Sequence, residues 1–170
     1  MELKHVAVLV VALVACATDL RSRRIPNVLT FGAAAAGLLF HAFAPAGEGL
    51  TFAALGLVVG IVAFFIPFAL RGLGGGDVKL LGALGAWLGP MATIWVALYT
   101  GVAGGLMAVA VAIGHGYGRR AASNVYLLLA HWRVAGLKAL PELTLDTSEG
   151  PRLAYALPIF AGAVVAIWLA

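Results

Sequence analysis

Two aspartates at the edges of apolar stretches are the residues of this chain best placed to do chemistry. Asp19 closes the first apolar run, and Asp77 follows three glycines inside the charged break Arg71–Lys79. An aspartate at the centre of a membrane helix costs about 2.5–3.5 kcal/mol of insertion free energy, and less near the interface. An ionisable residue in such a place is therefore a functional candidate. The other acids fall in expected loops or at the terminus, where water solvates them: Glu2, Glu48, Glu142, Asp146 and Glu149.

Two facing carboxylates can hydrolyse a peptide bond. At close range they cannot both ionise, so one keeps a proton while the other stays charged. The charged one takes a proton from water, which attacks the carbonyl, and the protonated one polarises that carbonyl and later protonates the leaving amine. The pair titrates as a unit, so neither Asp19 nor Asp77 has a fixed role. Gly74 and Gly76 lack Cβ atoms and would let an extended substrate backbone approach Asp77.

Each aspartate also has a purely structural interpretation. Asp77 could cap a helix that begins at Val78, and Asp19 could pair with Arg21 or Arg23 at the surface. For the aspartates to be purely structural, both of these interpretations would have to be correct, and on the same membrane face. This requirement favours the functional hypothesis.

Other hydrolytic or metal-binding arrangements are missing from the sequence. There is no His-Glu-x-x-His pattern, and the four histidines are dispersed. The single Cys16 excludes an internal disulfide framework and a cysteine-based zinc site. We therefore expect no metal and no cofactor.

Composition places the chain in a membrane. Hydrophobic residues make up 63% of its 170 residues and charged residues only 11%, and the mean hydropathy is +1.04. Soluble domains carry about a quarter charged residues. The net charge of +4 is spread between apolar stretches, so it sets membrane orientation and does not indicate nucleic-acid binding.

The apolar runs predict an all-α polytopic membrane protein, a single domain over residues 1–170 with about six transmembrane helices. We expect these helices at about 3–20, 28–43, 50–70, 80–88, 91–113 and 153–170, the fourth being short and the last interrupted by Pro158. Gly89-Pro90 separates the fourth from the fifth, and Asn27 is expected to cap the second. Cytosolic loops are expected at about 20–27, 71–79 and 115–152. The last loop should hold an interfacial amphipathic helix running from Val125 to about Leu140.

The basic residues predict the orientation. Lys4 alone would lie outside, which puts the N-terminus outside and both aspartates at the cytosolic face. The arginines after the first run also favour an uncleaved first helix over a lipoprotein leader, although Leu13-Val14-Ala15-Cys16 resembles a lipoprotein cleavage box. The basic residues expected inside are Arg21, Arg23, Arg24, Arg71, Lys79, Arg119, Arg120, Arg133, Lys138 and Arg152.

These motifs resemble a known family. Gly74-Gly75-Gly76-Asp77 fits the Gly-x-Gly-Asp signature of polytopic aspartic peptidases, and its continuation through Gly89 resembles the type IV prepilin leader peptidases. Asp19 followed by Arg21 and Ile25-Pro26-Asn27 is similar to that family's first catalytic motif, and Tyr155–Gly162 to its last helix.

The resemblance implies a multi-pass protein of the bacterial inner membrane that cleaves prepilins or pseudopilins just before their hydrophobic N-terminal helix, on the cytosolic side. Asp19 and Asp77 would be the catalytic residues, and the partners would be the prepilin leader and helix and the lipid bilayer. The first helix starts almost at Met1 and Cys16 is alone, as in the short Tad-type form that serves Flp-like pilins. N-methyltransferase activity is therefore not expected.

Two other hypotheses stay open from the residues alone. A small proton-coupled transporter could use the same two acids as a relay, although it would place carboxylates deeper in the bilayer. A membrane scaffold without chemistry would need the acids only as a cap and a surface pair.

Overall fold

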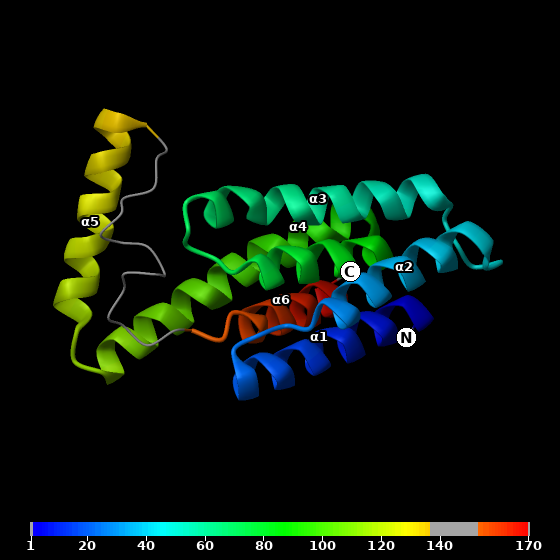
Figure 1. Cartoon of the computed structure of the whole chain (residues 1–170), viewed down its shortest axis with the longest axis horizontal. Helices are drawn as coiled ribbons and strands as arrows, with labels where there is room; N and C mark the ends of the chain where they lie inside the picture. Colours follow the sequence, from blue (N-terminus) through cyan, green and yellow to red (C-terminus); the bar gives the residue numbers. More distant parts are fainter. Residues whose placement is uncertain (1, 137–152, 170) are drawn as a thin grey trace.

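The computed structural model describes residues 2–136 and 153–169 as six helices, of which all but the fifth pack into one bundle (Figure 1). They are α1 (Leu3–Ser22), α2 (Asn27–Phe43), α3 (Leu50–Ala69), α4 (Gly75–Gly114), α5 (Gly118–Ala135) and α6 (Ala156–Leu169). Among the described helices, α1, α3 and α4 are long and apolar enough to cross a membrane, while α2 and α6 are shorter apolar helices. The all-helical prediction is confirmed. The number of membrane crossings stays a prediction.

The helix α4 consists of two segments that run in opposite directions. Gly89 has non-helical backbone angles (φ 76°, ψ 178°), and Pro90 follows it. Tyr155 lies against Gly104 in the second segment and also lines a cavity with Asp77 in the first, so the chain must reverse between them. The expected break at Gly89-Pro90 is therefore confirmed, but the fourth helix begins at Gly75, earlier than expected.

The first segment of α4, residues 75–88, is the centre of the bundle. Every residue from Leu80 to Leu88 is buried. A helix that is apolar on all sides belongs in an interior, and here α3 packs so closely on it that Gly56 and Gly85 are in backbone contact. Gly37 of α2 likewise lies against Trp87, with 2.9 Å between its Cβ position and that ring. The helices α1, α2, α3 and α6 pack around α4 and thereby fix Asp77 in space.

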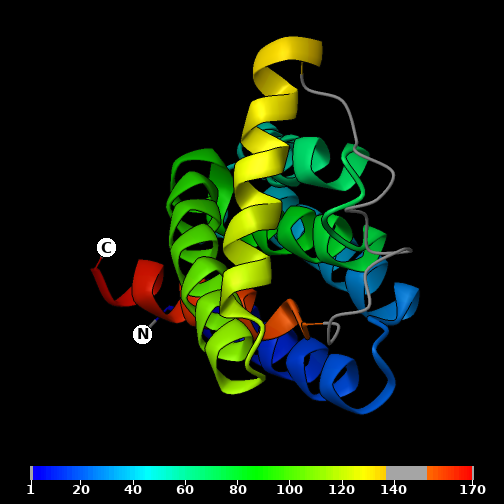
Figure 2. The same ribbon diagram turned by 90° about the vertical axis from the view of Figure 1, so that its left-hand side faces the viewer.

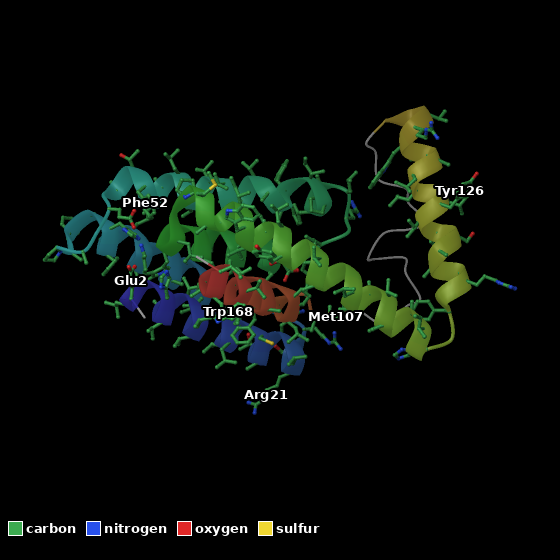
Figure 3. The ribbon with its side chains drawn as sticks, turned by 180° about the vertical axis from the view of Figure 1, so that it is seen from behind. Glu2, Arg21, Phe52, Met107, Tyr126 and Trp168 are labelled. Atoms are coloured by element: carbon green, nitrogen blue, oxygen red, sulfur yellow. The ribbon has the colours of Figure 1, made fainter. Side chains whose placement is uncertain are left out.

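The two ends of the bundle differ in character. At one end, Lys4 forms ion pairs with Glu48 (2.7 Å) and Glu2 (3.2 Å), which joins the start of α1 to the α2–α3 loop. Arg21 lies at the far end of α1 from Glu2, on the side of the molecule where α5 stands (Figure 3). The second segment of α4 continues past the bundle to α5, which lies crosswise to the bundle helices (Figure 2).

Three expected boundaries need correction. Asn27 is the first residue of α2, after Pro26 at the N-cap, and its side-chain oxygen accepts a hydrogen bond from Lys79 instead of capping the helix. Pro158 does not interrupt α6: the helix begins at Ala156, and proline is tolerated in a first helical turn, where no intrahelical N–H bond is needed. The amphipathic helix was expected to continue through Leu137 and Leu140, which lie outside the described residues. Within them α5 ends at Ala135.

Candidate active site

Asp77 lies in the first turn of α4, which begins at Gly75. Its Oδ2 atom accepts a hydrogen bond from the backbone N–H of Gly74 at 3.2 Å. This carboxylate therefore does cap the helix, but from inside its first turn, because α4 starts at Gly75 and not at Val78. Asp77 was expected in a cytosolic loop over 71–79, and that loop ends at Gly74 in the structure.

Asp19 lies in the last turns of α1 and reaches the other end of the chain. Its Oδ2 atom accepts a hydrogen bond from the backbone N–H of Ala156, the first residue of α6, at 3.2 Å. The partner found for this carboxylate is thus a helix N-terminus, where N–H groups lack intrahelical acceptors and the helix dipole favours negative charge.

Both carboxylates are buried at the same place. Asp19 and Asp77 are each 8% exposed, whereas aspartates are almost never that buried unless paired. They line a common cavity of about 610 Å³. Asp19 lies near the end of α1 and Lys4 near its start, so the cavity lies at the end of the bundle opposite the Lys4–Glu48 ion pair. The expectation that the two aspartates meet at one end of the helices is confirmed, although the sequence separates them widely.

A second hollow of about 390 Å³ borders the same pair. It is lined by the α1–α2 loop on one side and the glycine turn on the other. Asp19, Arg23, Gly74 and Asp77 line both hollows, so the carboxylates are open on two sides. The larger hollow is lined by Asp19, Arg23, Phe68, Ala69, Arg71, Leu73, Gly74, Asp77, Leu153 and Tyr155.

The two glycines singled out from the sequence have different surroundings. The nearest atom to a Cβ built on Gly74 is Asp77 Oδ2 at 3.1 Å, so this glycine faces the carboxylate and both hollows. A Cβ on Gly76 would meet the Ile25 side chain at 3.3 Å. Gly76 also lines the second hollow, but its missing side chain lets the α1–α2 loop pack against the Asp77 turn.

The α1–α2 loop is tied to α4 by a second contact. Lys79 Nζ donates a hydrogen bond to Asn27 Oδ1 at 3.0 Å and lies 5.4 Å from the centre of the Phe31 ring. From the sequence Lys79 is expected only as one of the basic residues on the cytosolic side. In the structure it connects the loop that follows Asp19 to the helix that carries Asp77.

Two arginines at the cavity rim have strained backbones. Arg23 (φ 54°) and Arg71 (φ 56°) are the non-glycine residues with positive φ among those described, and both line the larger hollow. The left-handed conformation costs an L-residue about 1–2 kcal/mol, and such strain gathers at functional sites. These backbone angles could not be predicted from the sequence, since glycine is the usual residue at such helix ends.

Sequence reasoning also missed the contribution of α6. The Ala156 N–H and the Tyr155 ring both belong to the site. The sequence of Tyr155–Gly162 indicates only a similarity to the last helix of the family and predicts no role in the site. Within residues 2–136 and 153–169, no three His, Cys, Asp or Glu side chains cluster closely enough to hold a metal ion.

Fold and site together define an all-helical protein with several helices apolar enough to cross a membrane and a pair of buried carboxylates at one end of its bundle. The model of the type IV leader peptidase family matches residues 6–109, which include both aspartates and the glycine turn, and the chain belongs to that family. No solved structure gave a significant match.

Curated relatives have consistent names. The chain is 32% identical over 123 residues to the prepilin leader peptidase/N-methyltransferase of Aeromonas salmonicida strain A449, covering 67% of this chain and 42% of the relative. The protein of that name from Aeromonas hydrophila gives the same identity and coverage. The type 4 prepilin-like proteins leader peptide-processing enzyme of Escherichia coli O78:H11 is 35% identical over 98 residues, 54% of this chain and 36% of the relative. The chain thus spans less than half the length of these relatives.

Proposed function

We propose that this chain is an aspartic endopeptidase that removes the leader peptide of type IV prepilins, with Asp19 and Asp77 as its catalytic pair. The observation that carries the proposal is the convergence of two buried carboxylates, from α1 and α4, on one cavity. Each carboxylate already accepts a hydrogen bond from a backbone N–H group, so the structural role of one does not require the other to lie nearby.

The chemistry follows from their proximity. Two carboxyl groups at one site hold a single proton between them, so one serves as base and the other as acid. The base takes a proton from water while the acid polarises the peptide carbonyl, and the proton then passes to the amine that leaves. The pair acts as a unit, so no fixed role is assigned to Asp19 or Asp77.

The two hollows suit a peptide that crosses the carboxylates. An extended segment could place residues on either side of the scissile bond into the hollows of about 610 and 390 Å³. Gly74, common to both, leaves room for the substrate backbone beside Asp77. A substrate helix must unwind here, because a peptide bond inside a helix is shielded by its own turns.

The proposed orientation puts the site at the cytosolic face. Arginines gather at the carboxylate end of the bundle, at Arg21, Arg23, Arg24 and Arg71, whereas Lys4 is held by Glu2 and Glu48 at the other end. Under the positive-inside rule the arginine-rich end faces the cytosol and the N-terminus lies outside. A prepilin whose leader is cytosolic and whose apolar helix is in the bilayer would present its cleavage site at this level.

The substrate class rests on the family and its named relatives, which process prepilins or prepilin-like proteins by name. Within that class we propose Flp-like prepilins of Tad systems, on the motif resemblance given above. The alternative of a proton-coupled transporter has no support among these relatives.

Co-expression with a Flp-like prepilin tests the proposal. The parent should convert the precursor to a smaller mature form, while Asp19→Asn and Asp77→Asn should leave it unprocessed. Glu48→Gln, an isosteric change of an exposed acid at the other end of the bundle, is the matched control and should process normally. Membrane fractionation should find all four proteins inserted. Processing that survives in both aspartate variants would reject the proposal.

A further inference from the structure

Tyr155 directly precedes the first residue of α6. Its side chain lines the larger hollow together with both aspartates. The residue after it donates its backbone N–H to Asp19. One short segment therefore binds a carboxylate with its backbone and presents a phenol beside the pair with its side chain.

The Tyr155 ring is held in place from two sides. It makes an edge-on contact with Phe64 of α3, with the ring centres 6.1 Å apart and the planes at 72°. Its hydroxyl lies over Gly104, where a Cβ would come within 2.6 Å of the oxygen. Gly104 therefore leaves the space that the hydroxyl occupies, and the phenol points to a defined position.

The described residues provide no hydrogen-bond partner for the Tyr155 hydroxyl. Across the described ranges 2–136 and 153–169 the Tyr155 hydroxyl makes no hydrogen bond, although the side chain is half-buried. Burial raises the pKa of this hydroxyl, and the nearby Asp77 carboxylate raises it further. The phenol thus remains protonated at neutral pH, as a fixed donor on a residue that lines the cavity with both aspartates.

We propose that the Tyr155 hydroxyl donates a hydrogen bond to the carbonyl oxygen of the scissile peptide and stabilises the negative charge that develops there. This inference rests on the proposed function. Preorganised donors aimed at a developing oxyanion are among the largest contributions to peptide hydrolysis. Tyr155 would thus be a further catalytic residue, one that carries no carboxylate.

The reaction balances without any proton leaving the phenol. The water oxygen bonds to the carbonyl carbon as its proton passes to the charged carboxylate, and the carbonyl oxygen gains negative charge against the Tyr155 O–H. The C–N bond then breaks, the amine takes a proton from the carboxyl pair, and the carbonyl re-forms as a carboxylic acid.

The test compares Tyr155→Phe with the parent, both as full-length protein in detergent, using a synthetic Flp-like prepilin peptide that contains the leader and the apolar helix. Phenylalanine keeps the contacts with Phe64 and Gly104 and removes only the donor. We expect kcat to fall about 10- to 100-fold with KM within about twofold of the parent, because the hydrogen bond strengthens in the transition state. Tyr99→Phe is the matched control and should keep the parent kcat, since Tyr99 stacks on Trp95 and is not among the residues that line either hollow.

An unchanged kcat in Tyr155→Phe, or a rise in KM alone, would overturn the inference. Asp19→Asn and Asp77→Asn are measured in the same assay. Cleavage by both of these would reject the proposed function itself, whereas their inactivity beside a fully active Tyr155→Phe would reject only the role of Tyr155.

A second measurement does not depend on how Tyr155→Phe folds. Replacing Tyr155 by a fluorinated tyrosine lowers the phenol pKa and keeps its shape. At neutral pH, where both phenols are protonated, this variant should keep a kcat at or above that of the parent, because a more acidic phenol is the stronger hydrogen-bond donor, and a loss of kcat of about tenfold would overturn the inference. The other titratable and charged groups that face the phenol across the cavity are Asp19, Arg23, Arg71 and Asp77, and all are unchanged in this variant.

Discussion

The Asp19 carboxylate on α1 and the backbone N–H of Ala156 on α6 are joined by a hydrogen bond of 3.2 Å. This contact brings the last helix of the chain to a site whose acids come from α1 and α4. The first N–H groups of a helix have no intrahelical acceptor, and the positive end of its dipole favours a carboxylate. The bond therefore satisfies both partners, and it explains why α6 belongs to the site although it contributes no acid.

The two aspartates should behave as a unit in kinetics. Asp19→Asn and Asp77→Asn should each lower kcat/KM for prepilin peptide cleavage by about 10³-fold or more, because each removes either the base or the acid of one shared mechanism. The double variant should be no worse than the worse single variant. Losses that multiply in the double variant would contradict a shared role. The measurement is single-turnover cleavage by purified protein.

The bond between Lys79 and Asn27 should support activity by fixing the loop that follows Asp19. Lys79→Met removes the 3.0 Å hydrogen bond and the contact with Phe31 and keeps an apolar chain of similar length. We expect kcat to fall about threefold to tenfold, since an exposed bond of this kind contributes about 0.5–1.5 kcal/mol. Asn27→Ala should cause a similar loss, and the two should not add in the double variant.

Lys4→Met is the control for that series. Lys4 forms its ion pairs at the opposite end of the bundle, so its removal should leave kcat unchanged. Full additivity of Lys79→Met and Asn27→Ala would show that the bond between them does not position the site.

The crossing of α3 and α4 should not tolerate a side chain at Gly56. A Cβ there would overlap the Gly85 backbone, and both chain segments are helical and cannot move apart cheaply. Gly56→Ala should lower the free energy of unfolding by about 1–3 kcal/mol, the usual cost of overpacking. Gly32→Ala is the control, because nothing lies within 4 Å of its Cβ position, and it should be neutral or stabilising by up to about 1 kcal/mol. Thermal unfolding in detergent measures both, and equal melting temperatures would contradict the prediction.

His41 should stabilise the end of the bundle opposite the site. Its Nδ1 accepts a hydrogen bond from the Glu48 N–H, so its Nε2 carries the proton and donates to the Trp87 carbonyl, each at 3.0 Å. His41→Phe leaves both backbone groups without this partner and should cost about 2–4 kcal/mol of unfolding free energy.

Cleavage per folded molecule should not change in His41→Phe, because the carboxylates lie at the other end of the bundle. His115→Phe is the control and should melt like the parent, because His115 is exposed, directly follows α4, and makes its side-chain hydrogen bond to the nearby Val111 carbonyl. A stable His41→Phe variant would show that the two backbone groups find other partners.

The sequence by itself determined the apolar helices and the two acids. Helix bounds such as Asn27–Phe43 and Leu50–Ala69 fall within about one residue of expectation, because uninterrupted apolar runs and their Pro and Gly boundaries are local signals. Asp19 and Asp77 stood out because an acid beside a membrane helix is costly wherever the rest of the chain lies.

Only the tertiary structure decided what surrounds those acids. Helices in lipid are apolar on every side, so their sequences do not reveal which face meets a neighbour. The Ala156 N–H, the Tyr155 hydroxyl and the contact of Gly76 with Ile25 all depend on how helices pack. Hydropathy is a property of each segment, whereas a contact between α1 and α6 exists only once the whole bundle has closed around the first segment of α4.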